Sequence, residues 1–392
     1  MKEIILNNQL QNSDKLFFFL EKFMTSEMIT NHNNQKVINS FIPPYPSEAF
    51  NRIVKNLKNG AKTPFSAYLA ITPECPNNCW HCSSEKRQKS SINPKYWYSV
   101  IDQLNEMGVC IIGFTGGEPL VHKELDDLIK YTAELGITTI LFTSGATLTQ
   151  SRVTRLEKNG LWAVALSLDH YDEKIFDKIR GRKGAFYDTI NALEWFANSK
   201  IYSMTTTLAT HQLIENNLTG MKKIYALAKK FNAQEFRIIE PMPTGNLQNA
   251  QENILLDENK IEQLKKFHIA INKQKCLPKV CSFNVMEGKE IFGCCAGIQH
   301  MYVEYSGKVC PCDFTPLSFG NIMDESIKII WQRMAKTMGK PREKCFIRDN
   351  QELIQKYSNN GKIYPLDTEA SCELCKHALK RDLPSYFKMI AK

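Results

Sequence analysis

Residues 75–82 read Cys-Pro-Asn-Asn-Cys-Trp-His-Cys, and the architecture of this 392-residue chain can be inferred outward from that stretch. Three thiolates at spacings of four and three residues can wrap one soft-metal centre from a single loop. Cysteines scattered at random would give roughly 0.01 such triplets in a chain of this composition, so the pattern is specific. A zinc ion would need a fourth ligand, and His81 is the nearest candidate. His81 stands between Trp80 and Cys82, however, which gives it poor geometry for binding the same ion. Three cysteines on an iron–sulfur cubane instead leave one iron open, which indicates chemistry.

Short apolar runs alternate with segments of helical periodicity on both sides of this loop. The expected strands are 68–72, 109–114, 138–142, 163–168, 202–208 and 235–239. Between the first two, Trp97, Val100, Ile101 and Leu104 fall on one helical face that ends near Gly108. Six strand–helix units predict an α/β fold with a parallel sheet and crossover helices. Periodicity alone does not separate an open sheet from a curved partial barrel.

A second motif follows the second expected strand, where residues 115–119 read Thr-Gly-Gly-Glu-Pro. Gly116 and Gly117 permit close backbone approach to a ligand, and the Glu118 carboxylate can receive an ammonium group. A Gly-Gly turn is weak evidence by itself. It gains force because both motifs follow adjacent strands at the same edge, where such folds place their active sites.

Composition excludes several classes of protein. Hydrophobic residues make up 43% and charged residues 23%, which is typical of a globular chain and excludes wholesale disorder. No apolar run is long enough to span a bilayer, and no signal peptide is recognisable, so we expect a soluble, cytoplasmic protein without a membrane partner. Thirteen cysteines in a reducing compartment indicate metal or cluster ligation rather than disulfides. The net charge of +9 is spread along the chain, without a basic arm for nucleic acid.

Three regions are expected along the chain. Residues 1–65 form an amino-terminal appendage with an amphipathic helix near 14–24, residues 66–250 carry the strand–helix alternation, and residues 251–392 form a cysteine-rich domain. Nine of the thirteen cysteines lie between Cys276 and Cys375.

The cysteine-rich region contains two further patterns. Residues 302–305 and 308–309 flank Ser306-Gly307 as the strands of a β-hairpin would, and this hairpin brings Cys294 and Cys312 together. Cys372 and Cys375 form a CxxC pair suited to two ligands on one centre. A four-thiolate zinc site is the structural alternative, because spacing does not separate the metals.

CxxxCxHC at 75–82 and GGEP at 116–119 resemble the radical S-adenosylmethionine (SAM) superfamily over about residues 66–245. The resemblance implies a partial (β/α)6 TIM-type barrel with a [4Fe–4S] cluster on Cys75, Cys79 and Cys82. It implies that SAM chelates the open iron and is reductively cleaved to a 5′-deoxyadenosyl radical, which takes a hydrogen atom from substrate. The SAM contacts implied are Gly116, Gly117 and Glu118 for the amine, the backbone around His81 for adenine, and Ser167 and Asp169 for ribose and carboxylate. Ser167 and Asp169 are equally well explained as caps of the next helix.

The carboxy-terminal cysteines resemble the SPASM/Twitch extensions of radical SAM enzymes, which carry auxiliary [4Fe–4S] clusters. No further cysteine follows Cys375, and this departure favours one auxiliary cluster over two. The expected ligands are Cys294, Cys312, Cys372 and Cys375. Cys295 could replace Cys294, and Cys310 could replace Cys312 although it would face the other side of a strand. Cys276, Cys281 and Cys345 are left to ligate a cluster, to donate a hydrogen atom, or to pack as small apolar side chains.

The resemblance implies an oxidoreductase or maturase that receives electrons from reduced flavodoxin or ferredoxin. SPASM/Twitch relatives modify ribosomal peptides by crosslinking, thioether formation or epimerisation, or they dehydrogenate and decarboxylate small metabolites of the sugar or tetrapyrrole type. The net positive charge of the chain narrowly favours a peptide substrate with an acidic leader. A non-enzymatic iron–sulfur carrier or scaffold is the alternative of another class, and it would not cleave SAM. We expect no nucleic-acid partner.

Overall fold

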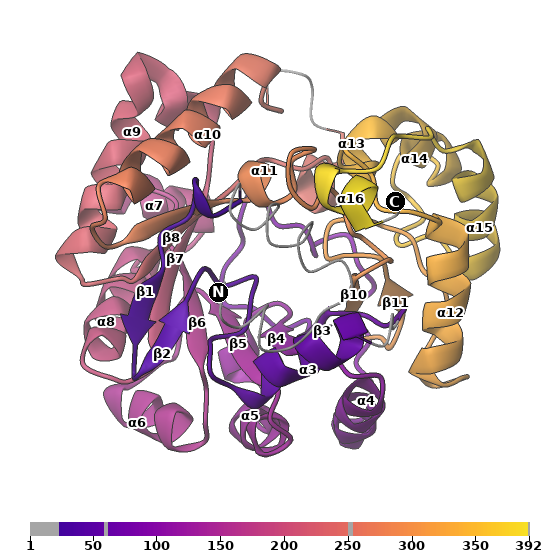
Figure 1. The fold of residues 1–392 in the computed structure, drawn as a ribbon, viewed down its shortest axis with the longest axis horizontal. Helices are drawn as coiled ribbons and strands as arrows, with labels where there is room; N and C mark the ends of the chain where they lie inside the picture. The colour runs from indigo at the N-terminus through magenta and orange to yellow at the C-terminus, as the bar shows by residue number, and fades with distance from the viewer. Residues whose placement is uncertain (1–22, 59–61, 250–253, 391–392) are drawn as a thin grey trace.

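The computed structural model describes residues 23–58, 62–249 and 254–390 (Figure 1). Two short strands, a nine-stranded sheet and the helices around it make up the described chain. The strands are β1 (Thr30–His32), β2 (Gln35–Val37), β3 (Ser66–Ala70), β4 (Ile111–Thr115), β5 (Thr138–Thr143), β6 (Ala163–Ser167), β7 (Tyr202–Leu208), β8 (Glu235–Ile239), β9 (Lys279–Ser282), β10 (His300–Val303) and β11 (Val309–Cys310).

The helices cover the outer side of the strands β3–β8 and gather again in the carboxy-terminal part, as Figure 1 shows. They are α3 (Glu48–Lys58), α4 (Lys95–Glu106), α5 (Leu125–Glu134), α6 (Gln150–Lys158), α7 (Glu173–Arg180), α8 (Ala185–Ala197), α9 (His211–Lys230), α10 (Glu258–Lys273), α11 (Phe283–Met286), α12 (Ile327–Met338), α13 (Phe346–Asp349), α14 (Gln351–Tyr357), α15 (Thr368–His377) and α16 (Ser385–Ile390).

The large sheet has the order β11-β10-β3-β4-β5-β6-β7-β8-β9. Every neighbouring pair in it is parallel except β10–β11. The strands β3–β8 are separated by crossover helices and curve around a common interior (Figure 1), which is the arrangement of a partial (β/α)6 barrel. The predicted α/β, partial-barrel fold class is confirmed.

The six expected barrel strands all exist. Strand β3 begins two residues earlier than expected, and β4 begins two residues later. Residues 202–208 and 235–239 match β7 and β8, whereas β3 begins and ends two residues before the expected 68–72. Thr72 has left the strand because its carbonyl accepts a hydrogen bond from Gly117 in the neighbouring loop. The helix expected after β3 is α4, and Trp97, Val100, Ile101 and Leu104 are all buried on it as predicted.

The region 251–392 continues the barrel sheet at both of its edges. Strand β9 pairs with β8, and β10 pairs with β3. The predicted hairpin is confirmed, with Tyr302 opposite Cys310 and Val303 opposite Val309. Helix α12 buries Ile330 and Trp331 in the same apolar core as α4, so the two regions share one packed interior. The boundary expected near residue 250 stays a prediction.

Part of the amino-terminal appendage covers the end of the barrel at which the strands begin. Val37 packs among apolar side chains that point into the barrel, including Ile140 and Met204. The backbone N–H and the hydroxyl of Ser40 both donate to the buried Glu235 carboxylate of β8, at 3.0 and 2.6 Å. These bonds fix the segment in the barrel, because a buried carboxylate needs its donors. The amphipathic helix expected at 14–24 lies almost wholly outside the described residues.

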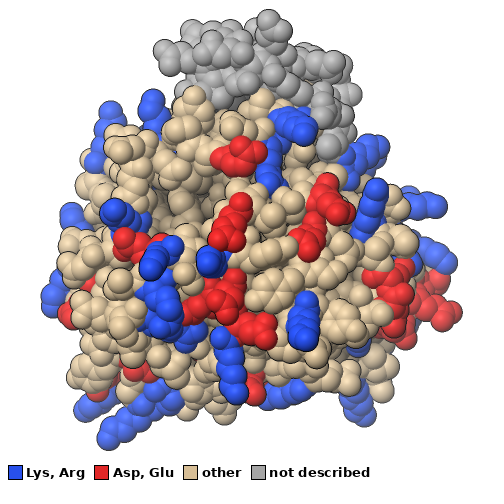
Figure 2. Space-filling view, turned by 90° about the horizontal axis from the view of Figure 1, so that it is seen from below, with Lys and Arg blue, Asp and Glu red and all other residues tan. Residues whose placement is uncertain are grey.

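The surface bears on the expected partners. On the face seen in Figure 2, acidic and basic side chains are interspersed, so the excess positive charge is not gathered there. Among the described residues, no helix has the length and apolar character that crossing a membrane requires.

Candidate active site

The three-cysteine loop lies between β3 and α4, at the carboxyl end of the barrel strands. Cys75 is exposed, and Cys79 and Cys82 are half-buried. Protein atoms packed around its sulfur raise the pKa of Cys75 to about 12, and the nearby Glu118, Cys79 and Cys82 add to that shift. Burial also raises the pKa of Cys79, but the Arg180 guanidinium, 3.6 Å from its sulfur, opposes the shift. The loop therefore holds three thiols close together, with a cation beside the middle one.

The two glycines of GGEP allow this loop to lie directly against the end of β4. A Cβ on Gly116 would stand 2.4 Å from the Thr72 carbonyl oxygen, and one on Gly117 would stand 2.3 Å from the Glu74 carbonyl oxygen. Gly116 also has a φ of +141°, which L side chains rarely adopt. The N–H groups of Gly117 and Glu118 donate to the Thr72 and Glu74 carbonyls, both at 2.7 Å. Any side chain at either glycine would separate the two loops.

Two other segments hold the loop from further along the chain. Gly181, just after α7, leaves room for the Asn78 carbonyl, and the Asn78 N–H donates to the Arg180 carbonyl at 2.8 Å. Gly245, beyond β8, approaches the Cys82 carbonyl in the same way, which accepts the Asn246 N–H at 2.9 Å. Backbone hydrogen bonds thus fix the loop to the end of α7 and to the segment that follows β8.

Glu118 is buried and fully hydrogen-bonded. Its Oε1 accepts the Thr143 hydroxyl at 2.5 Å and the Leu120 N–H at 3.2 Å. Its Oε2 accepts the N–H and the hydroxyl of Ser144, at 2.8 and 2.6 Å. Burial raises the pKa of Glu118, although these donors oppose the shift. The expected contact with the amine of SAM stays a prediction, and it would require Glu118 to exchange one of these four bonds.

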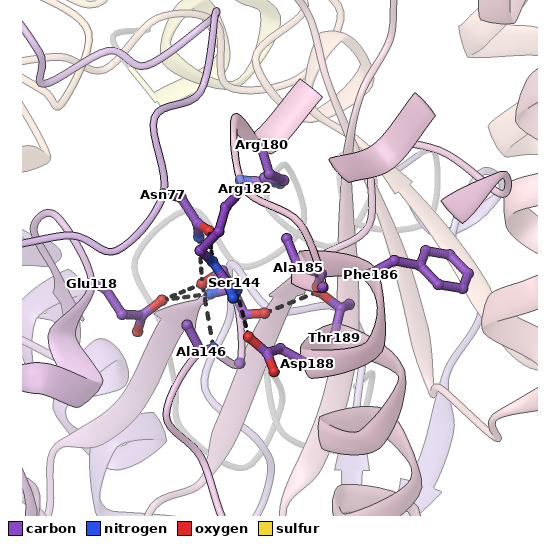
Figure 3. Close-up of polar contacts among 12 residues, drawn as sticks. Asn77, Glu118, Ser144, Ala146, Arg180, Arg182, Ala185, Phe186, Asp188 and Thr189 are labelled. Carbon is purple, nitrogen blue, oxygen red and sulfur yellow. Dashed lines mark hydrogen bonds and ion pairs between the residues drawn. The ribbon is translucent and has the colours of Figure 1, made fainter. Parts of the chain in front are cut away.

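Ser144, directly after β5, is the centre of a polar network that the sequence reading missed (Figure 3). Its hydroxyl receives a hydrogen bond from Asn77 of the cysteine loop at 3.0 Å and donates to Glu118. Arg182 donates to Asn77 at 2.8 Å and pairs with Asp188 of α8. The network ties the cysteine loop to the end of β5 and to the start of α8. A polar residue before Gly145 at a strand end was the available sequence signal.

Ser144→Ala should lower the free energy of unfolding by about 1–3 kcal/mol, because it leaves Asn77 and one Glu118 oxygen short of a buried partner. Urea denaturation followed by circular dichroism measures this change. Ser151→Ala is the matched control, since that exposed hydroxyl bonds only to Thr149. Equal denaturation midpoints for the two variants would contradict the role given to Ser144.

His81 and Asp169 are brought together, although they lie in different strand-end loops. The Asp169 carboxylate lies 3.6 Å from His81 Nε2, forms an ion pair with Arg180, and accepts the Leu208 N–H at 2.9 Å. Burial lowers the pKa of His81 to about 4, so the ring is neutral. Burial acts to lower the pKa of Arg180, but Asp169 and Cys79 outweigh it and raise that pKa.

Asp169 is therefore not a helix cap, because Asp172 caps α7 by accepting the Ile175 N–H. Ser167 ends β6, and its carbonyl accepts a hydrogen bond from Thr189 at 3.4 Å. The contacts expected of Ser167 and Asp169 with SAM stay predictions.

The chemistry of the site fits an iron–sulfur cluster with one open iron. The donors are three thiols from one loop, which are the ligands that an iron–sulfur cluster takes. His81 Nδ1 and Arg180 Nε beside the loop are buried without a hydrogen-bond partner. Cys75, Cys79 and Cys82 are the residues that would hold the cluster.

A cavity of about 430 Å³ occupies the barrel interior. Thr115, which ends β4 directly before Gly116, and Thr206 inside β7 both line it. On the other side it is lined by four carboxy-terminal cysteines: Cys294, Cys295, Cys312 and Cys345. The cavity therefore extends from the end of β4 to cysteines of the carboxy-terminal region.

Of the four expected auxiliary ligands, the structure places Cys294 and Cys312 on this cavity. Cys345 hydrogen-bonds the Cys294 sulfur, which lowers the pKa of Cys294 to about 6. Cys372 and Cys375 lie on α15, where the Cys372 sulfur is 3.8 Å from the Thr337 hydroxyl of α12. The structure thus brings Cys345 next to Cys294 and keeps the CxxC pair on a separate helix.

The remaining cysteines lie elsewhere. Cys310 is buried on β11 with its sulfur 3.4 Å from Arg87, whereas Cys312 lies beyond the end of β11 and lines the cavity. Strand alternation does not explain this difference, because residues two apart on a strand share a face. Cys281 is buried in a separate apolar cluster with Val285, and the Cys276 thiol donates to the Gln274 carbonyl after α10. Neither of these two thiols lines the cavity.

Two family models match the chain. Residues 69–218 match the radical SAM superfamily, and residues 294–365 match the iron–sulfur cluster-binding domain named SPASM. The first match contains the end of β3, the whole cysteine loop and β4–β7, and the second contains Cys294, Cys312 and Cys345.

Curated relatives and solved structures point the same way. The chain is 25% identical over 287 residues to an AdoMet-dependent heme synthase of Oleidesulfovibrio alaskensis, covering 67% of this chain and 73% of the relative. It is 27% identical over 288 residues to a protein of the same name from Methanosarcina barkeri, covering 67% and 80%.

Among solved structures, SuiB of Streptococcus suis bound to its precursor peptide SuiA has a TM-score of 0.60 at 17% identity, covering 77% of this chain and 72% of that one. The enzyme anSMEcpe with bound AdoMet and a Cp18Cys peptide has a TM-score of 0.56 at 19% identity, covering 84% and 97%. The same fold, the three-cysteine loop against GGEP and the two family matches lead to one conclusion: this chain is an enzyme of the radical SAM superfamily that carries a SPASM iron–sulfur domain.

Proposed function

We propose that this enzyme removes hydrogen, with loss of carbon dioxide, from a carboxylated small metabolite of the tetrapyrrole type. The observation that carries this proposal is the cavity of about 430 Å³ inside the barrel, a size typical of small-molecule sites. The curated relatives named AdoMet-dependent heme synthase support the tetrapyrrole class.

The cluster and SAM together supply a 5′-deoxyadenosyl radical once an electron from reduced flavodoxin or ferredoxin reaches them. The chain's own residues bind and orient. In the proposal, the backbone of Gly116 and Gly117 with Glu118, the segment around His81, and Ser167 with Asp169 hold SAM at the strand ends.

In the proposal, the substrate lies in the cavity between Thr115 and the carboxy-terminal cysteines. Thr115 borders it beside GGEP, and Cys294, Cys312 and Cys345 border it on the SPASM side. A substrate radical formed near Thr115 must lose one electron to complete a dehydrogenation or decarboxylation. Cys294, Cys312 and Cys345 are among the residues that would hold an auxiliary cluster, and that cluster would supply an acceptor for this electron.

Peptide modification is the second candidate. The net charge of +9 favours it, because a basic protein attracts an acidic leader segment. We place the enzyme in the cytoplasm, with no nucleic-acid or membrane partner, in either case.

Turnover separates the two candidates. With SAM and dithionite under anaerobic conditions, an iron tetrapyrrole bearing propionate side chains should yield a product lighter by one CO₂ and two hydrogens per side chain, with one 5′-deoxyadenosine formed for each. Mass spectrometry measures both, and the methyl ester of the same tetrapyrrole is the control. If only a precursor peptide stimulates 5′-deoxyadenosine formation, the peptide candidate replaces this one.

A further inference from the structure

Arg237 lies on β8 with its side chain on the barrel cavity, and only 2% of the residue is exposed. Its Nε and Nη1 atoms are buried without a hydrogen-bond partner. Among the described residues, no Asp or Glu forms an ion pair with it. It is also the one Lys or Arg among the described residues that line the cavity.

Aromatic side chains surround the Arg237 guanidinium. The rings of Phe283, Phe142 and Phe41 lie 4.9, 5.2 and 5.5 Å from its central carbon. The Tyr68 hydroxyl lies beside the Arg237 guanidinium, which acts to lower the Tyr68 pKa against the effect of burial. Rings stabilise a cation through their π faces, but they do not replace the hydrogen bonds that water would give its N–H groups.

The acids nearest to Arg237 do not serve as its counter-ion. Its charge opposes the rise in the pKa values of Asp313 and Glu287, but neither carboxylate comes within ion-pair distance. Burial raises the pKa of Asp313 to about 6 and that of Glu287 well above its usual range. Burial lowers the pKa of His300 to about 4, so this ring adds no positive charge.

The other deeply buried arginines show what Arg237 lacks. Arg87 lies 2.7 Å from the Glu304 carboxylate, and Arg180 pairs with Asp169. A buried charge without a partner is strongly destabilising, and proteins normally provide one. Arg237 is therefore set up for a negative charge that comes from outside the protein.

We propose that Arg237 and Tyr68 form a carboxylate-binding site in the barrel, where the carboxylate of an apolar small-molecule substrate supplies the missing counter-ion. A guanidinium presents a planar fork that matches a carboxylate, and the surrounding rings fit an apolar or aromatic body. This inference rests on the proposed function for its assumption that the substrate is a small carboxylic acid.

The position of Arg237 sets how such a substrate lies. Arg237 pairs with Thr206 across the sheet, below the strand ends where the cysteine loop lies. The carboxylate is therefore held in the barrel, and the rest of the molecule extends toward the strand ends. Gly113 makes room for this site, because a Cβ there would stand 2.5 and 2.6 Å from the rings of Tyr68 and Phe142.

Equilibrium binding tests the site without turnover. The probes are protoporphyrin IX and 2-naphthoate, each compared with its methyl ester, on the reconstituted protein with SAM present. Wild type should bind each acid more tightly than its ester. Arg237→Gln should weaken binding of the acids by about 10- to 100-fold, the value of a charge-assisted hydrogen bond, and leave the esters unchanged. Arg237→Lys should fall between the two, because it keeps the charge and loses the fork.

The control for folding is Arg152→Gln, a surface-side arginine that pairs with Asp126 away from the cavity, together with the SAM affinity of every variant. The site is refuted if neither acid binds wild type better than its ester, or if Arg237→Gln weakens acid and ester equally. If Arg237→Gln selectively weakens 2-naphthoate while tetrapyrroles are not turned over, the carboxylate site stands and the tetrapyrrole function fails. If tetrapyrroles are turned over and Arg237→Gln keeps full discrimination, the function stands and this site fails.

Discussion

Cys79→Ala is expected to reduce the formation of 5′-deoxyadenosine from SAM to background. Cys79 is the middle of the three thiols, and it lies 3.6 Å from Arg180, which in turn pairs with Asp169. The loop has no fourth cysteine beside Cys75, Cys79 and Cys82 that could replace it as a ligand. The variant should also lose about four irons per chain, because two thiolates on one loop are too few to retain a [4Fe–4S] cluster. Anaerobic reconstitution, iron analysis and chromatography of the SAM products measure both losses.

Cys276→Ser is the matched control for this prediction. Cys276 follows α10, and its thiol bonds only to Gln274, so the change should leave iron content and SAM cleavage unaltered. Full 5′-deoxyadenosine formation by Cys79→Ala would overturn the assignment of the loop. A loss of activity with unaltered iron content would show that Cys79 acts in some other way than as a ligand.

The barrel was predictable from the sequence because its signals are local. Residues 202–208 and 235–239 became strands as expected, since short β-branched runs between helical segments have few alternatives. The cysteine loop was predictable for the same reason, because its three ligands lie within eight residues. Strand ends were less predictable. Thr72 is β-branched and therefore favours a strand, but its carbonyl accepts a hydrogen bond from the Gly117 N–H in the next loop.

Contacts between distant segments were not predictable. Cys345 lies 51 residues beyond Cys294, with α12 between them, and no spacing rule connects the two. In the sequence, Arg237 is one of two charged residues in the expected strand 235–239, and its lack of a counter-ion becomes visible only when β8 is placed beside the barrel cavity. Ser40 likewise reaches Glu235 across 195 residues. These features depend on packing between elements, which a single sequence does not record.

A variant that lacks Cys75, Cys79 and Cys82 together should retain about four irons per chain, which corresponds to one auxiliary [4Fe–4S] cluster. Two fully thiolate-ligated clusters would need eight cysteines. Cys310 lies against Arg87, and Cys276 and Cys281 lie elsewhere in the fold. Without these three, the carboxy-terminal region offers six cysteines: Cys294, Cys295, Cys312, Cys345, Cys372 and Cys375. Iron and zinc analysis after anaerobic reconstitution measures the content.

Adding single alanine changes to this triple variant identifies the ligands of the auxiliary cluster. The expected set is Cys294, Cys312, Cys372 and Cys375, whereas the structure places Cys345 directly beside Cys294. If Cys372→Ala removes the four irons and Cys345→Ala does not, α15 must move its CxxC pair toward the cavity when the cluster binds. If Cys345→Ala removes them and Cys372→Ala does not, the cluster forms on the cavity wall and the CxxC pair is structural. About eight irons would contradict the single cluster, and zinc in place of iron would leave the first cluster to do all the chemistry.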